Sequence, residues 1–304
     1  MANLEAIRKR ISSVKSTQKI TKAMKMVAGA RLHKAQHRIT ALRPYAMTTG
    51  RVLHEVIGTD GGDDSEFSHP MLASREEKRS LYLVVTSDRG LCGPFNAGLT
   101  KRAEREWKDG EAAGRKVSMA IIGRKGRDYF ARRNAPIDHY FEGAWDGLGP
   151  DTARTIARRI CKPFVSGEVD AVHLVFNEFK SAMTQIVRVE QLFPLQVSKV
   201  EEPADNAATS DDSGAGGSGF IFEPSRAALL ERLVPMYVET TVMRALYESM
   251  ASELGARMTA MDSATKNAND MISSLSLVYN RARQAAITTE ILEIIGGAEA
   301  LQQA

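Results

Sequence analysis

The chain has 304 residues, 43% hydrophobic and 26% charged, which is typical of a folded protein of about two domains. No run reaches the roughly 18 apolar residues that a membrane-spanning helix needs. Two cysteines, Cys92 and Cys161, are too few for a disulfide-stapled scaffold or a Cys-rich zinc module. We expect both to be buried, reduced thiols.

The net charge of +4 is unevenly distributed along the chain. Residues 1–44 hold eleven Lys and Arg side chains and one acid, Glu5, so the remainder is net acidic. A basic segment of this kind is typical of binding to nucleic acid, an anionic membrane or an acidic protein. It also resembles a mitochondrial presequence, but the helical pattern continues past Ala30 without a cleavage site. We therefore expect no cleaved segment here.

The N-terminal region, from residue 3 to about residue 56, is predicted to be one long helix. Its apolar residues recur every three or four positions, with a change of phase near Gln18. These residues are Leu4, Ile7, Ile11, Val14, Ile20, Met24, Val27, Ala28 and Leu32. Pro44 is expected to bend or restart the helix, and the glycine-rich and acidic residues 58–64 to end it.

The C-terminal region contains a second long helix, predicted over 236–295, with a mean apolar spacing of 3.5 residues. That period, sustained over seven heptads, indicates a left-handed coiled coil. The expected seam consists of Met243, Tyr247, Met250, Leu254, Met258, Met261, Thr265, Ala268, Met271, Leu275, Tyr279, Ala282, Ala286, Thr289 and Leu292. Because the seam is rich in Met, Ala and Thr, it fits either an Ala-rich helical hairpin or a smooth rod that presents different faces to a partner.

The middle of the chain alternates short apolar runs with helical stretches, which predicts a small, mostly parallel α/β sheet. Buried strands are expected at 81–86, 117–122 and 171–176, an edge or hairpin strand at 183–190, and helices near 96–112, 124–133 and 151–166. After this region, residues 201–219 form an acidic, glycine-rich linker, and an apolar segment follows at 220–224.

Catalytic and ligand-binding motifs are sparse. The turn at 87–93 lacks the G-x-G-x-x-G spacing, and no lysine is placed as in a phosphate-binding loop, so a tight strand-to-helix turn is the better interpretation. The six histidines form no metal-ligand pattern, and His33 and His37 are expected to face solvent or pack. Cys92 is expected to be a packed turn residue rather than an activated thiol.

Three segments resemble a known family. Residues 11–28 (ISSVKSTQKITKAMKMVA) and 279–298 (YNRARQAAITTEILEIIGGA) are similar to the terminal helices of the gamma subunit of F-type ATP synthase. Residues 86–93 (TSDRGLCG) also match, so the resemblance extends in order along essentially the whole chain. The departures are the 201–219 insert, the 58–68 loop, and Phe220 and Phe222 where the family often has tyrosines.

The resemblance implies a fold in which the two terminal helices pair as an antiparallel coiled coil. A small, mostly parallel, Rossmann-like α/β domain is inserted between them. The implied segments are a shaft helix at 1–57, an α/β foot domain at 78–198, an acidic loop and foot segment at 199–224, and a second shaft helix at 225–304.

The resemblance also implies the function of a rotor shaft. One copy would join the alpha and beta subunits of the catalytic head to the epsilon subunit and the membrane-embedded proteolipid c-ring. Proton flow would turn the ring and the shaft, and the shaft would change the catalytic subunits without making or breaking a bond itself. We therefore expect no catalytic residue, cofactor or metal, and a peripheral location on the cytoplasmic side of a bacterial inner membrane.

The resemblance assigns contacts to two sets of residues. Those expected to face the catalytic head are Lys22, Met24, Lys25, Arg257, Arg283, Gln284 and Thr288. Those expected near the ring and the epsilon subunit are Phe220, Phe222 and Glu223. Without the resemblance, each Lys or Arg would be interpreted as part of a solvated helix face.

Two other classes of protein compete with this interpretation. A basic coiled coil that binds nucleic acid would account for residues 1–44 and would lose affinity steeply with salt, but the segment has no interleaved aromatic residues. A small α/β enzyme would account for the middle of the chain, but the sequence supplies no convincing set of catalytic groups.

Overall fold

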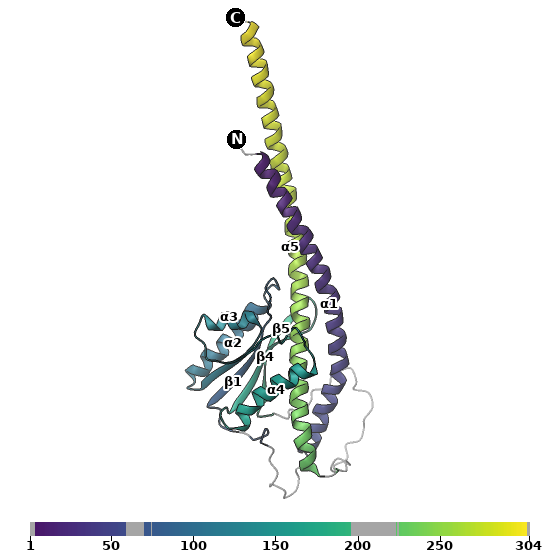
Figure 1. Cartoon of the computed structure of the whole chain (residues 1–304), viewed down its shortest axis with the longest axis vertical. Helices are drawn as coiled ribbons and strands as arrows, with labels where there is room; N and C mark the ends of the chain where they lie inside the picture. Colours follow the sequence, from purple (N-terminus) through teal and green to yellow (C-terminus); the bar gives the residue numbers. More distant parts are fainter. Residues whose placement is uncertain (1–3, 59–69, 74, 196–222, 224, 303–304) are drawn as a thin grey trace, which may run out of the picture. The chain divides into compact units, whose positions relative to one another are not determined.

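A computed structural model describes residues 4–58, 70–73, 75–195, 223 and 225–302 of the chain (Figure 1). The chain divides into two compact units. We call residues 1–30 with 257–304 the helix-pair unit, and residues 31–256 the sheet unit. Both long helices, α1 (Leu4–Gly58) and α5 (Arg226–Gln302), contribute residues to both units.

The sheet unit contains a five-stranded sheet in the order β3-β2-β1-β4-β5. Its strands are β1 (Arg79–Val85), β2 (Lys116–Ile122), β3 (Ile137–Phe141), β4 (Ala171–Phe179) and β5 (Gln185–Phe193). The pairs among β1 to β4 are parallel, whereas β5 runs antiparallel to β4. The prediction of a small, mostly parallel α/β sheet is therefore confirmed.

Helices cover both faces of the sheet, as Figure 1 shows. On one face, α4 (Pro150–Val165) and α5 pack on Leu81, Leu83 and Val85 of β1. On the other, α2 (Phe95–Ala112) and α3 (Arg124–Ala131) pack on Tyr82 and Val84. Because both faces are buried, β1 is apolar throughout instead of alternating with polar residues.

The turn after β1 is a packed structural turn. The Thr86 hydroxyl donates to the Ile122 carbonyl at 2.8 Å and accepts a bond from the Gly126 amide at 2.9 Å. Gly123 has φ +93°, and a Cβ there would lie 2.1 Å from the Thr86 oxygen, so only glycine fits. Cys92 is 2% exposed at this turn, and Cys161 is also a buried free thiol, as the sequence predicts.

Within the sheet unit, α1 and α5 pack against each other in antiparallel fashion. Leu53 and Val56 of α1 share a core with Leu230, Leu233 and Val234 of α5. Further along α1, towards its N-terminus, the Arg38 guanidinium lies 5.9 Å from the centre of the Tyr247 ring. The sheet unit therefore buries part of each terminal helix against the other, and part of α5 against the sheet as well.

The helix-pair unit is an antiparallel pair formed by the first residues of α1 and the last part of α5. Residue numbers increase along one helix as they decrease along the other. The contacts that show this are Gln18 with Asn269, Thr21 with Thr265, and Lys25 with Asp262. The least exposed positions of α1 recur in steps of three and four residues, as a coiled-coil seam requires. They include Leu4, Ile7, Ile11, Val14, Gln18, Thr21, Lys25 and Ala28.

The seam differs from the predicted one at several positions. Ile20 and Val27 are 60% and 53% exposed, because the heptad spacing continues without a phase change through polar Gln18 and Thr21. On α5, the predicted seam residues Met271, Thr289 and Leu292 are exposed. Ile272 occupies the seam in place of Met271. Thr289 and Leu292 have no partner on α1, because in the antiparallel register they lie beyond Leu4, where the described part of α1 begins.

The elements also differ from the prediction in three details. The short edge strand β3 (Ile137–Phe141) was not predicted, because Asp138 and His139 interrupt its apolar pattern. Helix α1 continues through Pro44 as one helix instead of restarting, and it ends at Gly58 as expected. Helix α5 begins at Arg226 and continues through Pro235. The insert at 201–219 lies outside the described residues.

Candidate interaction site on the paired terminal helices

Polar side chains meet between the two helices of the helix-pair unit where a coiled coil normally packs Leu or Ile. The Gln18 amide nitrogen donates to the Asn269 side-chain oxygen at 3.4 Å, and the hydroxyls of Thr21 and Thr265 lie 2.8 Å apart. The first contact is exposed and the second is part-buried, and polar contacts in a seam specify register at a cost in stability. The arrangement therefore fixes how the two helices align more than it strengthens their association.

An ion pair follows one turn further along. The Lys25 ammonium lies 2.6 Å from Asp262 Oδ1, and Lys266 lies 3.2 Å from the other carboxylate oxygen. These hydrogen bonds, that of Lys25 first, hold the pKa of Asp262 below its usual range. The Lys25 and Asp262 side chains are 44% and 33% exposed, so solvent screens the pair and it contributes little to stability.

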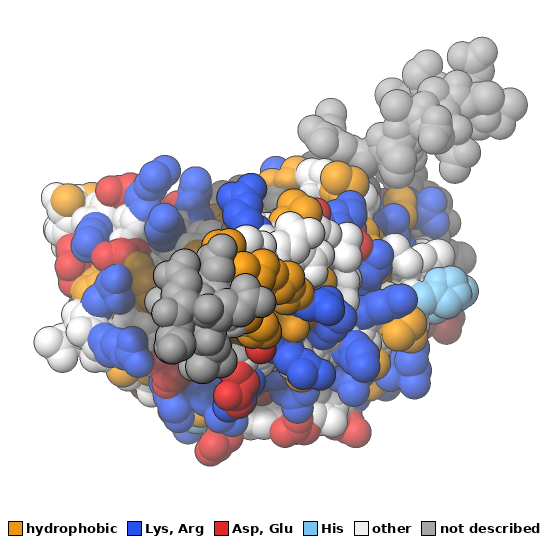
Figure 2. All heavy atoms as spheres, turned by 90° about the horizontal axis from the view of Figure 1, so that it is seen from above, with side chains coloured by type: hydrophobic (Ala, Val, Ile, Leu, Met, Phe, Trp, Pro, Cys, Tyr) orange, Lys and Arg blue, Asp and Glu red, His pale blue; other side chains and the backbone are white. Residues whose placement is uncertain are grey.

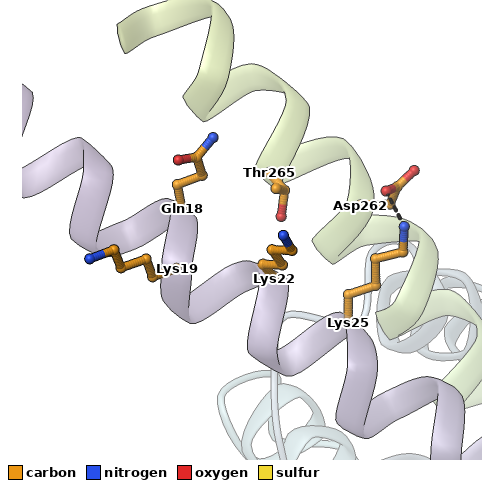
Figure 3. A pocket seen from close by; sticks show the side chains of 6 residues that line it. All are labelled: Gln18, Lys19, Lys22, Lys25, Asp262 and Thr265. Carbon is orange, nitrogen blue, oxygen red and sulfur yellow. Dashed lines mark hydrogen bonds and ion pairs between the residues drawn. The ribbon is translucent and has the colours of Figure 1, made fainter.

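These residues line an open groove of about 340 Å³, shown in Figure 3. Its lining comprises Gln18, Lys19, Lys22, Lys25, Asp262 and Thr265. In Figure 3, the Lys22 side chain points into the space between the helices, towards Thr265, while Lys19 points away from it. The Lys22 and Lys25 ammonium groups, against the one carboxylate among the lining residues, make this groove a candidate site for an anionic group.

The structure gathers only some of the residues that the sequence assigned to the catalytic head. Lys22 is exposed at the groove, Lys25 pairs with Asp262, and Met24 is half-buried next to the seam. The exposed apolar side chains near Met24 are instead Ile20, Met26 and Val27, at 60%, 62% and 53% exposure. A partner that makes apolar contacts with this part of α1 could therefore reach these three side chains more easily than Met24.

The other predicted contacts lie elsewhere. Arg257 is half-buried on α5, five residues before Asp262. Arg283, Gln284 and Thr288 are exposed, and Arg283 lies about 32 Å beyond Asp262 at 1.5 Å per residue. Glu223 is exposed, while Phe220 and Phe222 lie outside the described residues. These residues form separate contact zones and not one constellation.

The predicted seam included Thr265 but left out Asp262 and Asn269. The signal for a polar layer is polar residues at heptad spacing on both helices. On the N-terminal helix the prediction followed apolar residues only, which placed Ile20 and Val27 in the seam and left Gln18 and Thr21 out of it.

The last turns of α5 expose a run of large apolar side chains. Ile287, Ile291, Leu292, Ile294 and Ile295 are each between 43% and 66% exposed. The face of the molecule in Figure 2 shows a group of apolar side chains among many Lys and Arg side chains. Exposed apolar runs of this kind mark surfaces that a partner covers.

The described residues contain no group of three or more His, Cys, Asp or Glu side chains that could hold a metal ion. None of their helices combines the length and apolar character needed to span a bilayer.

The fold and the groove together define a class of protein: two long antiparallel helices with a polar seam, carrying an inserted α/β domain. A family model described as ATP synthase matches residues 3–301. The chain belongs to the family of ATP synthase gamma chains.

Relatives across the whole chain carry that name. The chain is 54% identical to the ATP synthase gamma chain of Sorangium cellulosum, over 100% of both sequences. It is 48% identical to that of an Anaeromyxobacter species and 45% identical to that of a Geobacter species, over 99% of this chain and 100% of each relative. The same fold occurs in a chain of the Euglena gracilis mitochondrial ATP synthase, with a TM-score of 0.64, 20% identity, and coverage of 98% of this chain and 94% of that one.

Proposed function

We propose that the chain is the rotating shaft of a bacterial, proton-driven ATP synthase and carries no catalytic group itself. Its partners would be the alpha and beta subunits of the catalytic head, the epsilon subunit and the proteolipid c-ring, with one copy in each complex. Family membership and the full-length similarity to bacterial gamma chains support this proposal. The chain would sit peripherally on the cytoplasmic side of the inner membrane, held there through the ring.

The observation that carries the mechanism is the charge asymmetry of the helix-pair unit. Residues 4–30 of α1 hold seven Lys and Arg and one acid, whereas residues 257–302 of α5 hold four basic and five acidic residues. One side of the pair is therefore strongly basic and the other nearly neutral. A ring of identical catalytic subunits around such a pair would meet a different surface at each orientation.

Different contacts can favour different conformations of the surrounding subunits, and this difference is what couples two sites. Ring rotation would turn the shaft, and each catalytic subunit would change its nucleotide affinity as the basic side passes. Weak, exposed ion pairs suit this role, because a deep contact would hold the rotor at one angle. The chain would transmit the change without reacting with ATP.

We assign three contact zones on the shaft. Lys22, Met24, Lys25 and Arg257 would meet an acidic lever of the catalytic subunits, and Arg283, Gln284 and Thr288 would meet the head further along α5. Phe220, Phe222 and Glu223 would lie on the side of the ring and the epsilon subunit. The exposure of Lys22, Arg283, Gln284 and Thr288 supports this assignment, because a contact residue must be reachable.

The second zone can be tested by replacing Arg283, Gln284 and Thr288 together with alanine. We expect ATP hydrolysis by the complex with alpha and beta subunits to fall at least tenfold, since three polar contacts to the head are lost. The control is Arg132→Ala, an exposed arginine directly after α3 in the sheet unit. Equal turnover for the triple variant and the control would exclude this zone as a head contact.

A further inference from the structure

The groove between the paired helices holds more positive than negative charge, and its cations differ in their contacts. Lys19 and Lys22 are exposed, and the described residues offer neither an ion-pair partner. Lys25 is held by Asp262, the single carboxylate that lines the groove. Figure 3 shows the Lys25 and Asp262 side chains meeting at one end of the groove.

The surroundings of the groove favour an acidic ligand. Between residues 6 and 54, α1 carries no Asp or Glu, while Lys19, Lys22 and Lys25 follow one another at three-residue intervals. A carboxylate from outside would therefore meet the unpaired Lys22 ammonium and the Lys25 ammonium that Asp262 already holds. Lys19 points away from the groove and would only add to the positive charge nearby. The negative charge of Asp262 would oppose the entry of the carboxylate.

We propose that Asp262 is an internal substitute for a partner's carboxylate: it holds Lys25 when the groove is empty and yields Lys25 when an acidic segment enters. The proposal rests on the proposed function, because it takes that segment to belong to the catalytic head. The geometry that supports it is the 2.6 Å contact between Lys25 and Asp262 at the edge of an open groove.

Such an exchange would limit how tightly the groove holds its partner. An entering carboxylate gains Lys25 only as Asp262 loses it, so the net gain in binding is small. When the partner leaves, Asp262 pairs with Lys25 again, and the ammonium is not left without a counter-ion. The same groove can then engage and release successive acidic segments.

A direct test uses the purified full-length chain and a fluorescently labelled hexaglutamate peptide as the carboxylate probe. Fluorescence anisotropy at low salt would measure peptide affinity for the wild type, Asp262→Asn and Asp270→Asn. Asp270 is the matched control, because it is an exposed acid on the same helix outside the groove, and its replacement changes net charge equally. Circular dichroism would confirm that all variants keep the same helix content.

The exchange predicts that Asp262→Asn binds the peptide about two- to fivefold more tightly than Asp270→Asn, the range expected for an exposed ion pair. When Lys25 is also replaced by Gln, the difference in peptide affinity between Asp262→Asn and Asp270→Asn should become smaller. Equal affinities for the two Asn variants, or weaker binding by Asp262→Asn, would overturn the proposal and leave Asp262 as a clamp between the helices. A gain seen with inorganic phosphate but not with the peptide would also overturn it.

The test separates this inference from the proposed function, because it needs no other subunit. If the peptide test fails while the chain still assembles with alpha and beta subunits and raises their turnover, only the exchange is wrong. If assembly fails, the partner is wrong, whatever the peptide result.

Discussion

Asp170 is a buried carboxylate directly before β4, and one residue supplies most of its partners. Arg79 donates to it from the backbone amide at 2.9 Å and from the guanidinium Nη2 at 2.8 Å. These hydrogen bonds hold the pKa of Asp170 below its usual range. Because Arg79 begins β1 and Asp170 precedes β4, this ion pair joins the starts of two neighbouring strands in the sheet unit.

Replacing Asp170 with Asn should destabilise the sheet unit at pH 7 by about 2–4 kcal/mol, because charged hydrogen bonds are lost around a buried group. A carboxyl whose folded pKa is lowered stabilises the fold above its unfolded pKa, near 4. This contribution is lost as pH falls through the lower folded pKa. The difference in free energy of unfolding between the wild type and Asp170→Asn should therefore become smaller below about pH 4.

Urea unfolding of the full chain at pH 7, 5 and 3 would measure this gap. The control is Asp138→Asn, because Asp138 is an exposed acid on the edge strand β3. A gap between wild type and Asp170→Asn that stays constant down to pH 3 would show that the stabilisation comes from packing and not from the charge.

At the level of elements, the seam of the helix pair includes small and polar side chains besides larger apolar ones. Ala28 is 1% exposed in it, and a Cβ added to the neighbouring Gly29 would be in van der Waals contact with the Met258 sulfur, at 3.5 Å. Small residues allow the two helices to approach closely, so the seam has little room for added atoms. Stability of the pair therefore depends on the size of its seam residues as well as on their polarity.

Ala28→Leu should destabilise the helix-pair unit by about 1–3 kcal/mol, because the added atoms overpack a filled site. Ala23→Leu, which makes the same change five residues earlier at an exposed position, should leave stability nearly unchanged. Hydrogen exchange of the amides of residues 4–30 would report the difference as faster local opening. Equal exchange rates in the two variants would contradict the close packing assigned to Ala28.

The sequence predicted the elements well where burial made the pattern regular. The strands predicted at 81–86, 117–122 and 171–176 are buried on both faces of the sheet, so nearly all their residues are apolar and the pattern was unambiguous. Strand β3 was missed because an edge strand tolerates polar residues such as Asp138. The seam was assigned partly wrongly, because apolar periodicity placed Ile20 and Val27 in it and left out Thr21, which pairs with the predicted seam residue Thr265.

The candidate site was less predictable than the fold. The resemblance named Lys22 and Lys25, but the groove exists only because antiparallel pairing brings residues about 240 positions apart into contact, with Lys25 and Asp262 separated by 237. The residue pattern within either helix does not determine how the two helices align with each other. Polar positions on two distant helices could suggest it, but only the structure shows which of them meet.

On the scale of the whole molecule, we propose that this chain acts through other subunits. The family model matches residues 3–301, and the helix-pair unit carries an uneven charge and an exposed apolar run on α5. Under this proposal, both features would act when a partner surrounds the helices.

Reconstitution with the alpha and beta subunits of the same complex would show whether the chain acts through them. ATP hydrolysis would be compared for the full chain, for a chain truncated after Asn280, for the two subunits without it, and for the chain alone. We predict no activity for the chain alone, a several-fold higher turnover when the full chain joins the subunits, and a weaker gain with the truncated chain, which lacks Arg283, Gln284 and Thr288. A chain that hydrolyses ATP alone, or that neither assembles nor changes turnover, would contradict the rotor function.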